Sequence, residues 1–196
     1  MLDEKAQMHT LEGVAAATIM LLVIVYAMDA TTLTPVSSST ASVHMVTELQ
    51  TLGQDILSAL DYAEPGYNST LKNDIMTWNG TEYTWNGKNY TETGSLQNNL
   101  TNNLTAILNA SLVSQGIAHN VEINFLRDNG TSLDHDNWKM IYNGDPSNNA
   151  VIVSRKISLH DGDINKTKLP DNPIDDIDPS TNLFNIVDVK LILWRT

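Results

Sequence analysis

A single apolar run near the start of the chain limits what it can fold into more than any other feature. Residues 13–28 contain only two polar groups, the hydroxyls of Thr18 and Tyr26, among sixteen positions. As a helix this run is about 24 Å long, and continuing it to Leu33 gives about 30 Å, the thickness of a bilayer's hydrocarbon core. We therefore predict a hydrophobic helix over residues 7–34 that requires an apolar environment, either a membrane or the core of a filament.

The same run can also be interpreted as a secretory signal that is removed after export. Such signals have a basic segment before the apolar run and small residues at a cleavage site after it. This chain instead has Asp3 and Glu4 before the run, Lys5 as the one basic residue there, and a poor cleavage site at residues 31–33. The pattern favours a helix that is retained in the mature protein.

The composition is that of an acidic, exported domain. The 196 residues include 23 Asp and Glu against 11 Lys and Arg, for a net charge of −12 and a pI near 4.5. This excess would repel nucleic-acid phosphates, so we expect no nucleic-acid partner, and its simplest interpretation is a solvated surface. The absence of cysteine excludes disulfides and cysteine-based metal or redox sites.

After the apolar run the pattern becomes amphipathic. Pro35 disrupts a helix because it lacks an N–H donor and clashes with the carbonyl four residues earlier. Residues 37–40 offer N-cap hydroxyls, and apolar residues then recur at three- and four-residue steps up to Leu60. The sequence predicts one long N-terminal helix with a joint at Pro35, whose second part, residues 35–63, packs on a head domain of residues 64–196.

The head domain begins with a turn and a hairpin. A Glu-Pro-Gly sequence at residues 64–66 ends the amphipathic helix. Two strand-like segments, 82–85 and 88–91, flank an Asn-Gly pair, which predicts a two-residue type I′ turn. A leucine stripe then predicts a second helix over residues 95–114, with Gly116 as its cap residue.

The remainder of the chain alternates between apolar and polar residues with a period of two. Segments 121–127, 138–142, 150–159 and 184–194 therefore predict four strands. Their alternation indicates an antiparallel sheet with one face buried against the helices. The predicted fold class is α+β, with a long kinked N-terminal helix and a head that contains a second helix and a four-stranded antiparallel sheet.

Sequons for asparagine-linked glycosylation are more frequent than random placement would give, and all of them follow Tyr67. Glycans are added on the exported side of a membrane, so this distribution fits an extracellular head behind a helical anchor. The alternative is an Asn- and Thr-rich surface that generates sequons through its composition alone. We predict N-glycosylation at Asn68, Asn79, Asn89, Asn99, Asn103, Asn109, Asn129 and Asn165.

The long loop before the last strand is rich in aspartate. Asp161, Asp163 and Asn165 have the spacing of the oxygen ligands that begin a calcium-binding loop. Lys166 and Asn172, however, occupy the positions where such a loop needs a glycine and a bidentate glutamate. A solvated acidic loop is the favoured interpretation over a calcium site, and we expect no metal or cofactor.

No arrangement of residues in the sequence indicates catalysis. The five histidines are scattered, without a helical pair or the order of a Ser-His-Asp triad. Trp78, Tyr83, Trp85 and Tyr90 lie in or near the hairpin and could stack on sugars, although cross-strand aromatic pairing is the simpler interpretation. We therefore expect a protein that is not an enzyme, in preference to a secreted hydrolase.

Several short segments, taken in order, carry a family resemblance. They are residues 7–13, 34–41, 120–124, 144–151 and 185–196. Together they resemble archaeal type IV pilin-like proteins, close to a haloarchaeal pilin-like family, over nearly the whole chain. The resemblance implies that residues 1–6 form a class III signal peptide, which a prepilin peptidase would cut between Ala6 and Gln7.

The resemblance also implies how the chain assembles. Similar bacterial pilins pair an acid at the mouth of the helix with a neighbour's N-terminal amine, and here that acid is Glu12. An unpaired charge among apolar helices is costly, so this contact would set the register between subunits. The alternative is a Glu12 that stays solvated at a membrane interface. Gly13 and Ala17 form a small-residue pair that lets helix backbones approach closely.

We therefore expect a structural subunit of an archaeal type IV pilus-like surface filament. It would insert into the membrane before assembly by the pilus machinery, then polymerise into a helical homo-oligomer through its hydrophobic helix. Its glycosylated head would be extracellular and would serve cell adhesion. The alternative is a membrane-anchored surface binding protein, or a minor pilin, that does not polymerise.

Overall fold

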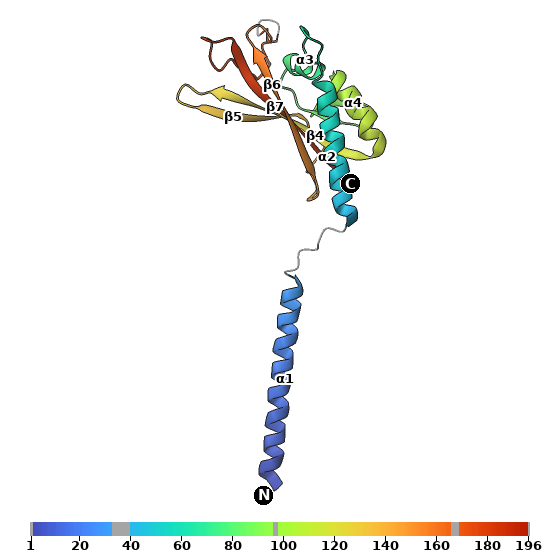
Figure 1. Ribbon diagram of the computed structural model, residues 1–196, viewed down its shortest axis with the longest axis vertical. Coiled ribbons are helices and arrows are strands. Elements are labelled where there is room, and N and C mark those ends of the chain that lie inside the picture. Colours follow the sequence, from blue (N-terminus) through green and yellow to red (C-terminus); the bar gives the residue numbers. More distant parts are fainter. Residues whose placement is uncertain (1, 33–39, 96–97, 166–168, 196) are drawn as a thin grey trace. The chain divides into compact units, whose positions relative to one another are not determined.

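The computed structural model describes residues 2–32, 40–95, 98–165 and 169–195 (Figure 1). The chain forms two compact units, Met1–Val43 and His44–Thr196. The first contains helix α1 (Leu2–Thr32). The second, called the head below, contains nearly all of helix α2 (Thr40–Leu60), together with α3 (Thr70–Met76), α4 (Asn103–Ser111) and the strands.

The N-terminal part of the chain is not one long kinked helix. Helix α1 ends at Thr32 and α2 begins at Thr40. Residues 33–39, which include the predicted joint at Pro35, lie outside the described residues. Serine, threonine and proline make up most of this segment, and none of them favours a helix interior. The prediction of a single helix across residues 7–63 is therefore wrong.

The head contains one seven-stranded sheet in the order β3-β2-β1-β5-β4-β7-β6. Its four long strands pair antiparallel, β5 with β4, β4 with β7, and β7 with β6. Three short strands extend the sheet beyond β5. The strands are β1 (Tyr83–Trp85), β2 (Tyr90–Glu92), β3 (Asn99–Leu100), β4 (Ile117–Asp128), β5 (Leu133–Ile141), β6 (Val151–His160) and β7 (Leu183–Arg195).

The predicted fold, a type IV pilin-like α+β head with a four-stranded antiparallel sheet, is therefore wrong. The sheet is mixed, because β1 runs parallel to β5 at Tyr83 and Ile141. The N–H of Tyr142 donates to the carbonyl of Tyr83 at 2.8 Å. Nearby, the N–H of Trp85 donates to Oδ1 of Asn143 at 2.7 Å, across 58 positions of sequence. No local pattern predicts pairing over such a separation.

The turn between β1 and β2 is also longer than the sequence predicts. Trp85 pairs with Tyr90, so the loop consists of residues 86–89 and not of two residues. The side chain of Asn86 explains the difference, because its Oδ1 accepts hydrogen bonds from the N–H groups of Lys88 and Asn89, both at 2.9 Å. This local side-chain turn takes the place of a type I′ turn.

The second predicted helix, over residues 95–114, begins too early. Strand β3, formed by Asn99 and Leu100, lies within its predicted first half, and α4 begins only at Asn103. A capping box fixes this start: Oδ1 of Asn102 accepts from the N–H of Thr105, whose hydroxyl accepts from the N–H of Asn102. A short 3₁₀ helix (Val113–Gln115) follows, and Gly116 ends it with a φ of 68°, as a cap glycine should.

A buried carboxylate joins α4 to α3, a helix that the sequence analysis missed. Oδ2 of Asp74 accepts a hydrogen bond from the N–H of Leu104 at 2.8 Å, in the first turn of α4. A helix N-terminus favours an anion because its first N–H groups have no partner within the helix. Burial nevertheless raises the pKa of the Asp74 carboxyl, although the N–H groups of Leu104 and Asn103 act to lower it.

The core lies between one face of the long strands and helices α2, α3 and α4. On α2, Leu49, Ile56, Leu57 and Leu60 are buried, and Val46 and Leu52 pack beside them, which is the stripe that the three- and four-residue spacing indicates. The strands contribute alternate residues, as a half-buried sheet requires. These include Val121, Ile123, Phe125, Val187, Val189, Leu191 and Leu193.

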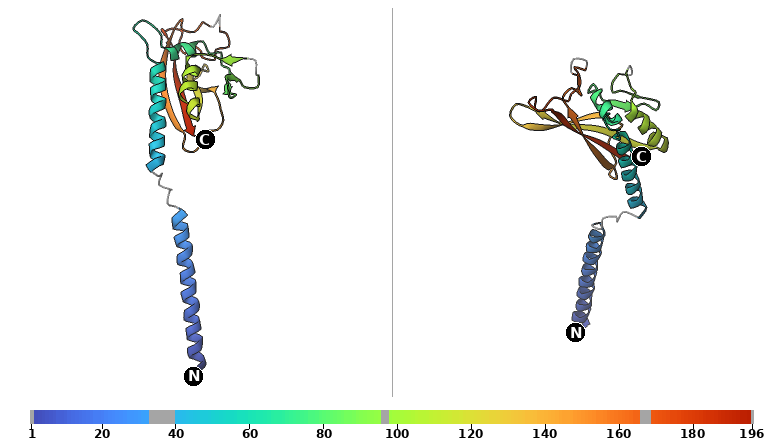
Figure 2. Two further views of the ribbon diagram at one scale, coloured as in Figure 1. Left: turned by 90° about the vertical axis from the view of Figure 1, so that its right-hand side faces the viewer. Right: turned by 45° about the horizontal axis from the view of Figure 1, so that its top comes forward.

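Helix α2 approaches the sheet closely at Gly53 and runs alongside β6 and β7 (Figure 2). A Cβ added to Gly53 would lie 2.7 Å from Cγ2 of Val153 and 2.9 Å from Cδ1 of Leu193. Both distances are below 3.0 Å, a limit that real Cβ atoms essentially never cross. A side chain at this position must therefore displace the methyl groups of Val153 and Leu193 in a close-packed core, which favours glycine here.

Substituting Gly53 by valine should destabilise the head. The added side chain must displace Val153 and Leu193, and overpacking of this kind typically costs about 1–3 kcal/mol. The measurement is the free energy of unfolding in denaturant. Gln54→Val is the matched control, because Gln54 is exposed on the same helix and surface changes usually stay within about 0.5 kcal/mol. Equal stability of the two variants would contradict the close packing.

Candidate functional site

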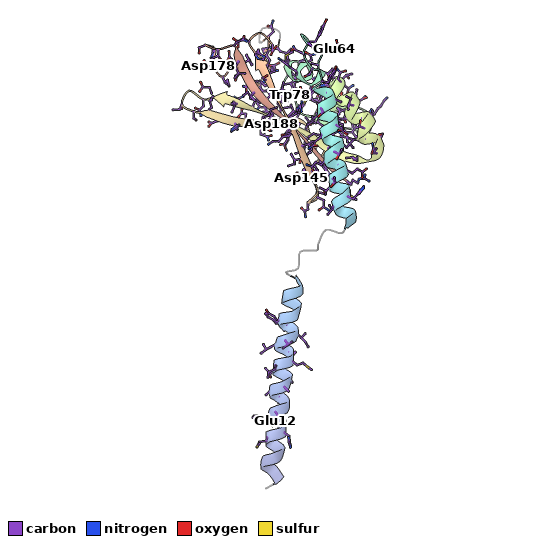
Figure 3. The ribbon with its side chains drawn as sticks, viewed as in Figure 1. Glu12, Glu64, Trp78, Asp145, Asp178 and Asp188 are labelled. Carbon is purple, nitrogen blue, oxygen red and sulfur yellow. The ribbon has the colours of Figure 1, made fainter. Side chains whose placement is uncertain are left out.

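Helix α1 presents apolar side chains to solvent on all sides. Its large apolar side chains between Met8 and Tyr26 are 50–77 % exposed, and Figure 3 shows side chains projecting from both sides of the ribbon. In the head, exposed large apolar residues occur only at scattered positions. A helix that is apolar all round is normally buried, so α1 is the part of the described chain that most requires an apolar partner.

Glu12 lies at the start of this apolar surface, one turn after His9 (Figure 3). Oε2 of Glu12 is 3.4 Å from Nδ1 of His9, and the two side chains are 72 % and 80 % exposed. The pair joins positions i and i+3, which face the same side of a helix. His9 is thus a partner for Glu12 within the same helix. The sequence predictions did not include it, although the three-residue spacing of the two residues can be read from the sequence.

The small residues predicted to mediate assembly are accessible. Gly13 and Ala17 are exposed, and nothing lies within 4 Å of a Cβ added to Gly13. The hydroxyl of Thr18 donates to the carbonyl of Val14 at 2.8 Å, so this polar group is satisfied within the helix. A second helix could approach this part of α1 without leaving that hydroxyl unpaired.

The predicted leader junction lies within α1, and the side chains of Ala6 and Gln7 lie outside the described residues. In α1 the described side chains are those of Met8, His9 and residues 11–26. Over the described parts of the chain, no helix has both the length and the apolar character needed to cross a membrane.

Every predicted glycosylation site has an exposed asparagine. The eight sites lie before or after α3, in the β1–β2 loop, in β3, on α4, in the β4–β5 turn and after β6. A sequon is useful only where the asparagine side chain points to solvent, since the attached glycan is bulky. The exposed asparagines are Asn68, Asn79, Asn89, Asn99, Asn103, Asn109, Asn129 and Asn165.

The three buried asparagines of the described chain serve a different purpose, and none is part of a sequon. Asn120 donates to the carbonyl of Gly144 and accepts from the N–H of Asn143. Asn185 bonds the backbone of β4 through both atoms of its amide. Asn172 donates to the carbonyl of Trp78 at 2.8 Å. Each bridges segments distant in sequence, as disulfides do in other small exported domains.

The described residues of the aspartate-rich loop contain no group of acidic side chains arranged for a metal ion. Asp163 is already paired, because its Oδ2 lies 2.7 Å from Nζ of Lys72 and accepts from the N–H of His160 at 2.6 Å. Asp161 and Asn165, the other predicted ligands, are exposed. In the segments that the structure describes, no three His, Asp or Glu side chains are grouped so that they could hold a metal ion.

The aromatic residues of the hairpin region belong mainly to the core. Trp78, Tyr83 and Tyr90 are 2 %, 6 % and 3 % exposed, so their faces are closed to a sugar. Trp85 stacks on Tyr90, with ring centroids 5.0 Å apart. Cross-strand aromatic pairing is therefore the role that the structure supports for this hairpin.

A buried hydrogen-bonded pair joins this aromatic cluster to β4. The hydroxyl of Tyr90 lies 2.8 Å from Nε2 of His119, and Nδ1 of His119 lies 3.4 Å from the carbonyl of Ile117. In a neutral ring, Nδ1–H donates to Ile117 while Nε2 accepts from Tyr90. Burial lowers the pKa of His119 to about 4, although the Ile117 carbonyl acts to raise it, and burial also raises the pKa of the Tyr90 hydroxyl. Both groups are therefore neutral at pH 7, and their hydrogen bond joins β2 to β4.

This burial predicts an acid-sensitive head. Below pH 6.5 the unfolded chain binds a proton at His119, whereas the folded chain does so only near pH 4. Stability is therefore complete above pH 6.5 and falls by about 3 kcal/mol as the pH drops through 4. His119→Gln should flatten the dependence of the unfolding free energy on pH between 6.5 and 4, while the exposed His135→Gln should retain it. Identical slopes in both variants would contradict this assignment.

Comparison with known proteins places the chain in a family without assigning its activity. No curated protein and no solved structure matches it. Residues 5–193 match the family described as "Family of unknown function (DUF7288)". The match includes α1, the head and nearly every residue discussed above, so this chain is a member of the DUF7288 family.

Proposed function

We propose that this protein is a structural, non-catalytic subunit of an archaeal type IV pilus-like surface filament, held together by α1. The observation that carries the proposal is the apolar surface of α1, whose large side chains are at least 50 % exposed from Met8 to Tyr26. Packing such helices side by side among copies removes this surface from water, at roughly 25 cal/mol for each Å² buried. The apolar run that begins at Gly13, whose last residues lie outside the described side chains, would hold the subunit in the membrane before assembly.

The start of α1 supports a packed state in preference to a lone anchor. Within a bundle, Glu12 would be removed from water, and an uncompensated buried charge is expensive. His9, whose Nδ1 lies 3.4 Å from Oε2 of Glu12, would compensate this charge from the same chain when it is protonated. Gly13 and Ala17 follow immediately, and small residues are what closely approaching helix backbones require.

The distribution of asparagines supports an exported, glycosylated head. All eight sequon asparagines are exposed, and the three buried asparagines stand outside sequons. Glycans would also protect a head that contains no disulfide.

Substitutions at the start of α1 should reduce filament formation. Gly13→Leu blocks close backbone approach and Glu12→Ala removes the charge, so both should give fewer and shorter filaments by electron microscopy of sheared surface material. Membrane insertion and glycosylation should be unchanged. Val14→Leu is the control, because it alters a neighbouring apolar residue while leaving the small-residue pair intact.

The same experiment distinguishes the filament from its rival. If wild type and both variants show equal filament numbers, neither packing nor pairing at this helix drives polymerisation. If no variant and no wild-type sample shows filaments, the chain is a membrane-anchored surface binding protein or a minor subunit, as the exposed helix alone would also permit.

Mass spectrometry of protein from the native host should find glycans on several of the eight sequon peptides. Asn68, Asn99 and Asn129 are favoured, because their threonines Thr70, Thr101 and Thr131 are exposed as well. The peptides that contain Asn120, Asn172 and Asn185 are the internal control and should be unmodified. Unmodified masses at all eight sequons would contradict an exported, glycosylated head.

A further inference from the structure

The sheet of the head has a second face that the helices do not cover. Since side chains alternate along a strand, the neighbours of the core residues point the other way. Across this face, Lys139 of β5 lies opposite Glu122 of β4, which lies opposite Lys190 of β7. The next row contains Asp188 of β7 opposite Lys156 of β6. None of these residues belongs to the core, and we call this surface the open face.

The open face differs in charge from the rest of the chain. Its central rows carry three lysines against two carboxylates, and Asp128, at the end of β4, is a third carboxylate on the same face. The whole chain has 11 Lys and Arg against 23 Asp and Glu. Lys156 is 71 % exposed beside Asp188, with 3.6 Å between Nζ and Oδ2. Oδ1 of Asp188 is buried and accepts no hydrogen bond in the described structure. The open face is thus the part of the sheet suited to an acidic partner.

Apolar groups and a hollow accompany these charges. Ile152 and Ile186, which also point away from the core, are 62 % and 41 % exposed. A hollow of about 550 Å³ lies among Ile186, Lys156 and Lys190. Protein interfaces typically combine apolar contact of this kind with surrounding polar groups.

The predicted glycans leave this surface clear. No sequon asparagine lies in α2 or in any of β4, β5, β6 and β7. All eight lie in the segment from α3 to α4 or in connections between elements. A glycan on an interface would obstruct it, so α2 and the open face are the two large surfaces of the head that remain free for contacts between proteins.

The exposed side of α2 complements the open face in charge. Helix α2 contains no lysine or arginine, whereas Glu48 and Asp55 are exposed. With His44, Thr51 and Leu52 they line a groove of about 400 Å³, and Arg195 reaches the edge of it, 3.5 Å from Glu48. Because α2 covers the core face of the sheet, its exposed side and the open face point in opposite directions.

We propose that the open face of one copy binds the exposed side of α2 in the next copy. Two different, complementary surfaces on opposite sides of one molecule make a heterologous contact, which continues from copy to copy as an open filament unless its rotation closes a ring. Charge complementarity selects this pairing over contacts between two open faces, which would place lysines against lysines. This inference rests on the proposed function, because it requires that copies of the chain assemble. It adds a second contact, between heads, to the contact between α1 helices.

Cysteine pairs test this contact directly, because the chain contains no cysteine of its own. The full-length double variant Thr51→Cys/Ser154→Cys places one thiol on α2 and one on β6, both at exposed positions. Under oxidising conditions it should give a ladder of disulfide-linked multimers, while each single variant should give no such ladder. Ala106→Cys/Ser154→Cys is the matched control, because Ala106 is exposed on α4 between two sequons, and it should give no ladder.

Neutralising the lysines tests the role of charge. Lys139→Gln and Lys156→Gln, each added to the Thr51→Cys/Ser154→Cys pair, should lower the yield of multimers about two- to fivefold. Lys88→Gln, in the β1–β2 loop beside a sequon, should leave the yield unchanged.

The possible outcomes separate this inference from the proposed function. Filaments without a ladder would overturn the contact between heads and leave assembly through α1 intact. A ladder without filaments would support the contact and overturn the filament. Dimers from Ser154→Cys alone would show that two open faces meet, which overturns the inference, and the absence of both filaments and ladder would overturn both proposals.

Discussion

The head depends on the burial of one face of its sheet beneath α2, α3 and α4. With no disulfide to restrain the unfolded chain, the stability must come from this apolar core and from hydrogen bonds. The close approach at Gly53 sets how tightly α2 can lie on β6 and β7. Because the helices occupy only that face, the other face of the sheet remains available for contacts with other proteins. Three lysines lie on this second face, and the sequons lie outside its four long strands.

The two units of the chain satisfy their apolar residues in opposite ways. The head encloses its own core, with Leu60, Leu108, Val121 and Leu191 completely buried. Helix α1 encloses nothing, and its side chains from Leu11 to Tyr26 are exposed. The head thus buries its apolar residues without a partner, whereas α1 does not. The free energy gained by removing the surface of α1 from water becomes available only in a lipid or protein environment.

The long elements of the head can be predicted from the sequence, but the pairing between distant segments cannot. The long strands β4, β6 and β7 follow from strict alternation, and the buried side of α2 follows from its spacing, because both patterns are local. The hairpin of β1 and β2 also follows from its local pattern, although its turn is longer than predicted. Its pairing with β5, through Tyr83 beside Ile141, and the two-residue strand β3 depend on distant partners, so local patterns cannot predict them. The start of α4 was signalled by Asn102 and Thr105, but the leucine stripe that extends into β3 concealed it. The burial of His119 follows only from the assembled sheet.

The buried asparagines restrict which residues can stand two positions after them in the sequence. If the head is glycosylated as proposed, serine or threonine two residues after a buried asparagine would create a sequon whose glycan the fold cannot accommodate. After Asn120 and Asn185 these positions are Glu122 and Val187, one on the open face and one in the core. After Asn172 the chain continues with Pro173, which already prevents recognition. Each buried asparagine that holds the backbone together therefore excludes serine and threonine two residues later. This exclusion comes from glycosylation during export and not from the packing of the folded head.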